Sequence, residues 1–407
     1  MIVFKGISQL LTCPRRVGRA PFADERDALG FIEDAALVVD GGQVVSVGPA
    51  REAPGGEVID LGGVVVMPGL VDPHTHLVYA GDRARDFVAR SRGESYEAIA
   101  RAGGGIQTTV AATRGASADE LHGLGRARLS RLLARGVTTV EVKSGYGLTV
   151  QDELKQLEVI RRLGDEGPQR VISTLLLHMV PPEWKEDRAG WVDAVRHELL
   201  AEARRRRLAD HVDVFCESIA FTADESQALL SAALSVGFEI KAHVDQRSAT
   251  GFGARAARMG ALSLEHLEHA DEETIEAMAQ SETRAVLLPT ASLFLGDAAR
   301  PPVAALREAG VPIALATDLN PGTSPTFDPW LVATLACTWY GLRPAEALRG
   351  LTVEAALALG LEDGTGTLTP GAPADFLVTR ATRWEELLYG LGHEPVAETW
   401  VAGQRRT

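Results

Sequence analysis

Two histidines separated by one threonine, His74-Thr75-His76, follow an apolar run and a Pro-Gly in the first fifth of the chain. Residues i and i+2 of an extended strand point to the same face, so the two imidazoles are expected to project side by side. Such a pair is suited to binding one metal ion. An isolated His-x-His is equally compatible with two hydrogen-bonded histidines at a strand end, so the choice depends on the rest of the chain.

The segments that would position these histidines alternate between short β-branched runs and longer helical stretches, as βα units do. Eight runs can be counted, and most are separated by room for a single helix. Eight such units predict an α/β fold, a (β/α)8 TIM-like barrel, with its active site at the C-terminal ends of the strands. The predicted strands span residues 69–76, 136–145, 170–178, 212–218, 238–245, 260–267, 284–290 and 312–318.

Polar or ionisable side chains stand at the ends of seven of these eight predicted strands. Because the C-terminal ends of barrel strands meet at one face, these side chains are expected to lie close together. This concentration favours the metal interpretation of the histidine pair. The side chains are His74, His76, Lys143, His178, Glu217, His243, His266 and Asp318.

Three neutral imidazoles and one carboxylate form a donor set suited to zinc, with iron as the alternative. A bound cation would lower the pKa of a water molecule toward about 7. Asp318 would accept a proton from that water and pass it to a leaving nitrogen, while His266 would orient the water or stabilise an oxyanion. Asp318 is also compatible with a helix N-cap, and one of His266 and His269 with a capping role. We assign the metal ligands as His74, His76, His243 and Asp318.

The composition excludes several classes of partner. The formal net charge of −14 argues against nucleic acid and against anionic membrane surfaces, and an anionic substrate would need a local arginine. No apolar run approaches the ~20 residues of a membrane-spanning helix, and the N-terminus lacks the pattern of a signal peptide. The scattered cysteines Cys13, Cys216 and Cys337 fit a reducing cytoplasm, where we expect the protein to act.

Both ends of the chain differ from the middle in residue composition and in the number of turns that their sequence predicts. The first ~65 and the last ~40 residues are rich in valine and glycine and punctuated by turns, which predicts short antiparallel strands. We therefore predict a small β-sandwich domain from residues 1–66 and 368–407. Residues 67–367 would form the catalytic barrel domain.

Motifs spread over the predicted barrel carry a family resemblance. They include PGLVDPHTH, GGGI, EVKSGYGL, KAHVDQ and ALATDLNPGTSP. Together they resemble the amidohydrolase superfamily and, within it, the imidazolonepropionase family, to which EVKSGYGL and GGGI are specific. The resemblance implies hydrolysis of a ring C–N bond of 4-imidazolone-5-propanoate to N-formimidoyl-L-glutamate in histidine degradation. It also implies a cytoplasmic homodimer that uses zinc or iron, held by the same four ligands.

The resemblance further implies a substrate pocket. Arg83 offers a planar guanidinium that matches the propionate carboxylate, and Gly322 lets the backbone approach closely. Arg83 is equally compatible with an ion pair to Asp82 or Asp86. Tyr96 is an additional candidate. The pocket residues implied by the resemblance are Arg83, Tyr146, His178, Gln246, Asn320, Gly322 and Thr323.

Barrel hydrolases with two ions usually bridge them with a modified lysine at the end of strand 4. Here the fourth predicted strand ends in Phe-Cys-Glu-Ser, without lysine, and Lys143 belongs to the second strand, so we predict one ion per chain. Lys143 is expected to pair with Glu141 or another carboxylate.

Two other functions compete with ring hydrolysis. Deaminases of heterocyclic amines on this fold carry His-x-x-Glu where this chain has Gln246, so the missing glutamate argues against deamination. Some relatives carry glutamate at this position, and some carry glycine where this chain has Thr290. A catalytically silent scaffold would show gaps in the ligand set, and none is seen.

Overall fold

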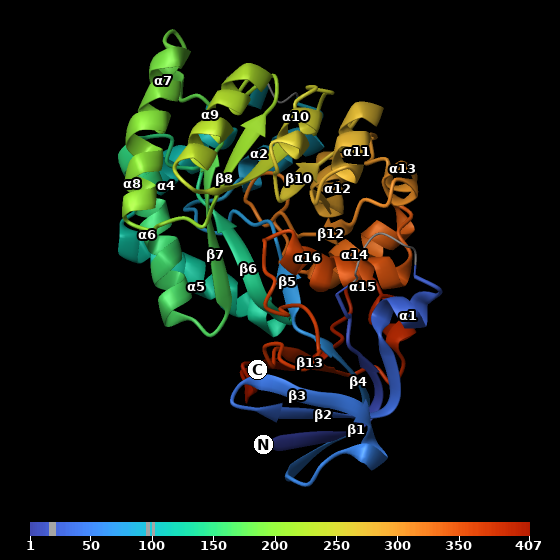
Figure 1. The fold of residues 1–407 in the computed structure, drawn as a ribbon. Coiled ribbons are helices and arrows are strands. Elements are labelled where there is room, and N and C mark those ends of the chain that lie inside the picture. The colour runs from blue at the N-terminus through green and yellow to red at the C-terminus, as the bar shows by residue number, and fades with distance from the viewer. Residues whose placement is uncertain (16–21, 95–97, 100–101) are drawn as a thin grey trace.

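The computed structural model describes residues 1–15, 22–94, 98–99 and 102–407 and contains two sheets (Figure 1). The barrel sheet has eight parallel strands in the order β12-β11-β10-β9-β8-β7-β6-β5. The terminal sheet has seven strands in the order β15-β14-β13-β4-β1-β2-β3, drawn from both ends of the chain. The predicted α/β class, an eight-stranded barrel with a separate sheet from the two termini, is confirmed.

Each strand of the barrel overlaps one of the eight predicted runs. The strands are almost wholly buried, as expected for a parallel sheet covered by helices, and this is why they read as nearly continuous apolar runs. The strands are β5 (Leu70–Asp72), β6 (Val137–Lys143), β7 (Arg170–Leu177), β8 (His211–Cys216), β9 (Glu239–Val244), β10 (Ser263–His266), β11 (Arg284–Leu287) and β12 (Ile313–Leu315).

Helices surround the barrel on its outside (Figure 1). Local sequence signals start several of them: capping boxes formed by Ser117 with Glu120 and by Thr222 with Glu225 begin α5 and α9. None of the helices among the described residues is long and apolar enough to cross a membrane. The helices are α2 (Ala84–Ser91), α4 (Ile106–Gly115), α5 (Ala118–Ala134), α6 (Val150–Glu166), α7 (Arg188–Ala194), α8 (Leu200–Arg205), α9 (Ala223–Ser235), α10 (Gly253–Arg258), α11 (Glu272–Ala279), α12 (Pro289–Leu295), α13 (Val303–Glu308), α14 (Pro329–Thr338), α15 (Pro344–Gly350) and α16 (Val353–Leu357).

The first and last barrel strands meet through the residues that follow them. The Asp318 N–H donates to the His74 carbonyl at 3.1 Å, and the His76 N–H donates to the Leu319 carbonyl at 2.9 Å. Below them, the Thr317 hydroxyl donates to Asp72 Oδ2 at 2.6 Å. This closure sets the residues after β12 directly beside the histidines after β5.

The terminal sheet combines β1 (Ile2–Leu11), β2 (Phe31–Asp40), β3 (Gln43–Pro49) and β4 (Glu57–Pro68) with β13 (Phe376–Thr379), β14 (Val396–Val401) and β15 (Gln404–Arg405). The short α1 (Glu25–Leu29) precedes β2. β13 pairs antiparallel with β4, and β1 pairs parallel with β4, which joins the two ends of the chain. The predicted domain boundary after residue 66 falls within β4, and the division into two domains stays a prediction.

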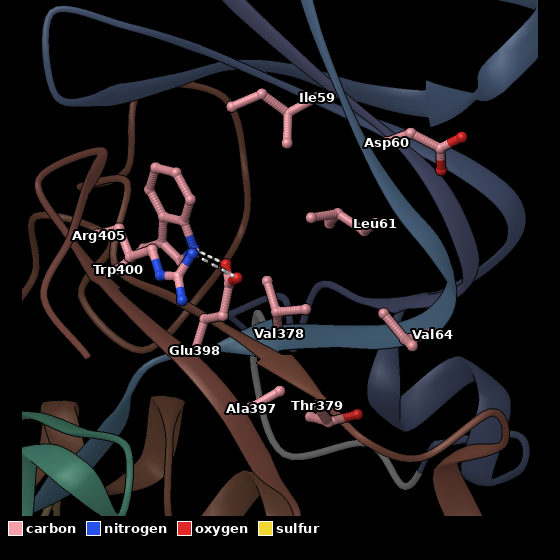
Figure 2. A pocket seen from close by; sticks show the side chains of 10 residues that line it. All are labelled: Ile59, Asp60, Leu61, Val64, Val378, Thr379, Ala397, Glu398, Trp400 and Arg405. Atoms are coloured by element: carbon pink, nitrogen blue, oxygen red, sulfur yellow. Dashed lines mark hydrogen bonds and ion pairs between the residues drawn. The ribbon is translucent and has the colours of Figure 1, made fainter.

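A groove of about 380 Å³ lies in the terminal sheet (Figure 2). Trp400 Nε1 donates to Glu398 Oε2 at 2.9 Å, and Arg405 Nη1 lies 3.0 Å from Glu398 Oε1. The rest of the lining comes from the β4, β13 and β14 segments. None of the polar side chains at the barrel strand ends lines this groove, so it is separate from the candidate site.

Candidate metal centre

The two histidines of the HTH motif and Asp318 meet at the C-terminal end of the barrel. His74 Nε2 lies 3.1 Å from His76 Nε2, and each of these nitrogens lies 3.4 Å from Asp318 Oδ1. The His243 ring lies 4.4 Å from the His74 ring and 5.6 Å from the His76 ring, between centroids. All four side chains are buried. The structure therefore brings the four predicted ligands together.

The geometry of this cluster fits a metal ion. A tetrahedral ion with metal–nitrogen bonds of about 2.0–2.1 Å holds its ligand atoms about 3.3 Å apart. The three separations among His74, His76 and Asp318 are 3.1, 3.4 and 3.4 Å. Asp318 is not the helix cap that its sequence context allowed, because the residue that caps α14 is Asp328. Three imidazoles and a carboxylate suit a divalent transition metal.

Burial and charge set the protonation of the cluster. Burial lowers the pKa of His76 to about 4 and that of His243 well below its usual value, so both rings are neutral at pH 7 and offer a lone pair. Burial would raise the pKa of Asp318, but hydrogen bonds and charge from the facing imidazoles hold it below its usual value. Burial would likewise lower the pKa of His74, but the Glu265 carboxylate raises it to about 9. Metal binding at His74 therefore involves release of a proton.

The backbone at the strand ends adopts conformations that non-glycine residues rarely occupy. The φ angles are 55° at Asp245, 79° at His266, 69° at Leu267 and 50° at Asp318. Such positions cost about 1–3 kcal/mol each and cluster at functional sites. Here His266 ends β10, Leu267 follows it, and Asp245 and Asp318 come after β9 and β12.

His266, the second predicted catalytic residue, joins the cluster from β10. Its ring lies 5.5 Å from the His243 ring and 6.0 Å from the His74 ring, between centroids. Its Nδ1 lies 3.8 Å from Glu268 Oε2. The neighbouring His269 is exposed.

Two predicted pocket residues line the approach to His76. The His178 ring stacks on the His76 ring at 6.0 Å with 28° between their planes, and the Tyr146 ring lies 5.7 Å from His178. Burial lowers the pKa of His178 to about 3. Burial and the Asp318 carboxylate raise the pKa of the Tyr146 hydroxyl, while the Arg83 guanidinium opposes that rise. Both side chains are therefore uncharged at neutral pH, and Tyr146 keeps its proton to donate.

Arg83 lies against the loop that follows β12. Its Nε pairs with Asp86 Oδ2, which is one of the two ion pairs that its sequence context allowed. A Cβ built on Gly322 would lie 3.2 Å from Arg83 Nη1, so a glycine lets this loop approach the guanidinium closely. The neighbouring Arg90 donates from Nη2 to the Gly322 carbonyl at 3.4 Å. Arg83 and Gly322 thus lie together.

Asn320 is engaged within its own loop. Its Nδ2 donates to the Asp318 carbonyl at 2.7 Å and to Thr323 Oγ1 at 2.8 Å. Its Oδ1 accepts from the N–H groups of Gly322 and Thr323 at 2.8 and 2.7 Å. The side chain therefore shapes the loop rather than facing an open pocket. Gln246 is partly exposed two residues after β9, and Tyr96 lies outside the described residues.

Comparisons with known proteins identify the family of this chain. Residues 65–405 match the model of the amidohydrolase family. The chain is 44% identical over 403 residues to the imidazolonepropionase of Aeromonas salmonicida (strain A449), covering 97% of this chain and 98% of that protein. It is 47% identical to the imidazolonepropionase of Caulobacter vibrioides (strain NA1000 / CB15N), covering 94% and 96%. The chain belongs to the imidazolonepropionases of the amidohydrolase family.

A solved member of the wider amidohydrolase fold gives the same architecture. The adenosine deaminase from Xanthomonas campestris with bound zinc superposes with a TM-score of 0.70 and 19% identity, covering 99% of this chain and 92% of that one. At this identity the likeness concerns the fold alone.

Charged residues inside the barrel strands are the part of the site that sequence reasoning missed. Lys143 contacts Glu141, as expected, but also two further carboxylates that the sequence did not single out, Asp213 and Glu265. A second buried lysine, Lys241, was also missed. The available signal was a charged residue inside each of the runs VDVFC, EIKAHV and SLEH.

Glu217 was singled out at the end of β8 but does not join the cluster. Its carboxylate accepts from the N–H groups of Ser218 at 2.9 Å and Arg247 at 3.0 Å, and from the Ser248 hydroxyl. It ties the loop after β8 to the loop after β9.

Proposed function

We propose that this protein hydrolyses a ring C–N bond of 4-imidazolone-5-propanoate and releases N-formimidoyl-L-glutamate. The observation that carries the proposal is that His74, His76, His243 and Asp318 meet at the end of the barrel. The donor atoms of His74, His76 and Asp318 lie 3.1–3.4 Å apart. The near-full-length identity to imidazolonepropionases supports the choice of substrate.

The donor set supports one zinc or iron ion per chain, held by the four side chains of the cluster. A bound ion of this kind acidifies a water molecule and polarises a carbonyl. His76 and His243 are neutral without it, which suits them to bind a cation. Because the pKa of Asp318 is held below its usual value, its carboxylate is ionised at neutral pH and able to bind a cation.

Asp318 would also move the proton. Water adds to the ring carbonyl carbon, and the Asp318 carboxylate accepts the proton that this water loses. His266, close to His74 and His243, would donate a hydrogen bond to the oxyanion that forms on the carbonyl oxygen. Asp318 then returns the proton to the ring nitrogen as the C–N bond breaks. One water molecule is consumed, and both nitrogens stay in the product.

The pocket residues would hold the substrate for this reaction. Arg83 would bind the propionate through its terminal guanidinium nitrogens, since its Nε is already paired with Asp86. The uncharged Tyr146 and His178 would donate to the substrate without attracting a second anion. Gln246, Gly322 and Thr323 would complete the lining, and Asn320 would hold its shape.

The product distinguishes this reaction from deamination. We expect the loss of substrate absorbance to be matched by N-formimidoyl-L-glutamate, identified by mass spectrometry, with no ammonia released. A deaminase would release ammonia in equal amount, a route that Gln246 in place of glutamate disfavours. Stoichiometric ammonia, or no turnover by freshly metal-loaded protein, would show that the proposal is wrong.

The family resemblance also supports a homodimer that works in the cytoplasm. Residues 67–367 would form its catalytic domain, and residues 1–66 with 368–407 the second domain. Sedimentation velocity should give a particle of twice the mass of the 43.4 kDa chain. A monomer at micromolar concentration would contradict the assembly.

A further inference from the structure

A cluster of charged side chains lies inside the barrel, in contact with the candidate ligands. It contains two lysines and three carboxylates, contributed by β6 and by the three consecutive strands β8, β9 and β10. None of these five side chains has any exposed surface. We call these five residues the buried charge layer: Glu141, Lys143, Asp213, Lys241 and Glu265.

Lys143 is surrounded by three carboxylates. Its Nζ lies 2.8 Å from Glu141 Oε2, 2.6 Å from Asp213 Oδ2 and 3.2 Å from Glu265 Oε2. Among these contacts it donates hydrogen bonds to Asp213 Oδ2 at 2.6 Å and to Glu265 Oε1 at 3.4 Å, and it pairs with Glu141 by charge. Lys143 therefore draws carboxylates of β6, β8 and β10 toward one point.

Lys241 links the same carboxylates to the chain that carries the histidine pair. Its Nζ lies 2.8 Å from Glu141 Oε1 and 2.8 Å from Glu265 Oε1. It also donates to the Pro73 carbonyl at 3.0 Å. Because Pro73 precedes His74, Lys241 fixes the backbone from which that imidazole projects.

Two carboxylates of the layer contact the ligand imidazoles directly. Glu265 Oε2 lies 2.7 Å from His74 Nδ1. Asp213 Oδ1 lies 3.1 Å from His243 Nδ1, and Glu265 Oε2 lies 3.2 Å from the same nitrogen. The Asp213 contact is a hydrogen bond, and Glu265 lies within ion-pair distance of both rings. Both carboxylates approach the Nδ1 side of the rings, and the opposite nitrogen of His74, Nε2, faces Asp318. Carboxylates placed in this way fix the tautomer and orientation of metal-binding histidines.

Burial of five charged side chains inside the barrel costs free energy. Removal of charges from water is repaid only when each is paired and hydrogen-bonded, and apolar side chains of similar volume often stabilise a core as well or better. The interiors of barrels of this type are filled mainly by branched apolar residues. The layer therefore needs a role beyond packing, and its contacts with His74 and His243 supply one.

We propose that the buried charge layer positions the metal centre. Asp213 and Glu265 hold the Nδ1 atoms of His243 and His74, and the two lysines hold those carboxylates in place. The five are positioning residues: Asp213 and Glu265 contact the ligand imidazoles, and the other three act through these two carboxylates and the backbone at Pro73. The proposal rests on the proposed ligand set, but it concerns metal binding rather than the identity of the substrate.

Metal affinity tests the proposal directly. Asp213→Asn and Glu265→Gln keep the size of each side chain and remove its charge. Zinc affinity of the metal-free proteins is measured by competition with a chromophoric chelator, with circular dichroism and thermal unfolding reporting the fold. We expect affinity to fall about 10- to 100-fold in both variants. The visible spectrum of the Co²⁺-loaded variants should change as well.

Glu153→Gln serves as the matched control. Glu153 is a buried carboxylate that accepts from the N–H groups of Gly145, Gly147 and Leu148 and contacts no candidate ligand. It should keep wild-type zinc affinity even if its stability falls. Folded Asp213→Asn and Glu265→Gln proteins with wild-type affinity and an unchanged Co²⁺ spectrum would overturn the proposal.

Imidazole ¹⁵N NMR of the zinc-loaded wild type provides a test that needs no variant. His74 and His243 should each carry their proton on Nδ1. A proton on Nε2 of either ring would overturn the proposal. A wild type that binds zinc but turns over no imidazolone propionate contradicts only the proposed function. A wild type that binds no zinc contradicts the inference too.

Discussion

In the proposed function, Asp318 has two tasks. Its Oδ1 lies 3.4 Å from the Nε2 atoms of both His74 and His76, so it completes the donor set. The same imidazoles keep its pKa low, so it is a carboxylate before water adds. A φ of 50° turns it toward the cluster. A group so placed can bind a cation and still accept a proton from a neighbouring water.

Asp318→Asn should abolish measurable turnover. An amide can neither accept nor return the proton, and the loss of a general acid–base typically costs about 10²- to 10⁴-fold in kcat. Turnover should be measured at known metal content, so that loss of metal is separated from loss of proton transfer. A metal-loaded Asp318→Asn protein with near wild-type kcat would contradict the assigned role.

Arg83→Ala should weaken substrate binding. Removal of one partner from a partly buried charge pair costs about 2–5 kcal/mol, which should show mainly as a higher KM. Arg83→Lys should restore only part of the loss, because lysine cannot reproduce the planar fork. Arg85→Ala, an exposed neighbour on the same helix, is the control. A wild-type KM in Arg83→Ala would place Arg83 outside the pocket.

At the scale of elements, the site depends on how the barrel closes. β5 and β12 are short, and the residues after them complete the contact between the first and last strands. Thr317 carries much of this contact. Its hydroxyl donates to Asp72 Oδ2 at 2.6 Å and accepts from the Leu319 N–H at 3.1 Å. The closure thus places Asp318 against His74 and His76.

Thr317→Val should destabilise the barrel. The substitution keeps the side-chain shape but leaves the buried Asp72 Oδ2 without its hydroxyl donor, which costs about 1–3 kcal/mol in the free energy of unfolding. Urea unfolding followed by fluorescence measures the change. The exposed Thr382→Val provides the baseline. Equal unfolding midpoints for the two variants would show that the closure does not depend on this hydroxyl.

The strands and the side chains that meet at their ends were predictable because both leave local signals. β-branched runs gave all eight barrel strands, and a polar residue after a run such as β7 or β12 marked the strand end. The buried charge layer was not predictable in this way. Asp213, Lys241 and Glu265 lie inside strands, and only the assembled barrel shows that they point inward and meet. Nor did the sequence reveal that Asn320 is saturated by its own loop.

At the scale of the whole molecule, the two ends of the chain form one sheet beneath the barrel (Figure 1). β13 pairs with β4, which leads directly into β5 and the histidine pair. The composition of the two ends predicted strands there. Their pairing was not predictable, because β4 and β13 are more than 300 residues apart and leave no local signal of their contact. Because the net charge is −14, binding of an anionic substrate would depend on a local cation, for which we propose Arg83.

Metal removal should lower the stability of the entire protein. A ligand that binds only the native state at 100 times its Kd stabilises that state by about 2.7 kcal/mol. A chelator should therefore lower the Tm, and added zinc should restore it. His243→Ala should show a Tm that neither treatment changes. A wild-type Tm that is insensitive to the chelator would contradict a metal bound to the folded barrel.

The central claim is that one metal ion, held by His74, His76, His243 and Asp318, serves ring hydrolysis. The most direct test is metal content by mass spectrometry on the same preparations whose turnover of 4-imidazolone-5-propanoate is measured. We predict one zinc or iron ion per chain in active protein. His74→Ala and His243→Ala should lose both the ion and turnover, because three ligands leave the shell incomplete. Two ions per chain, or none in a preparation that opens the ring, would contradict the account.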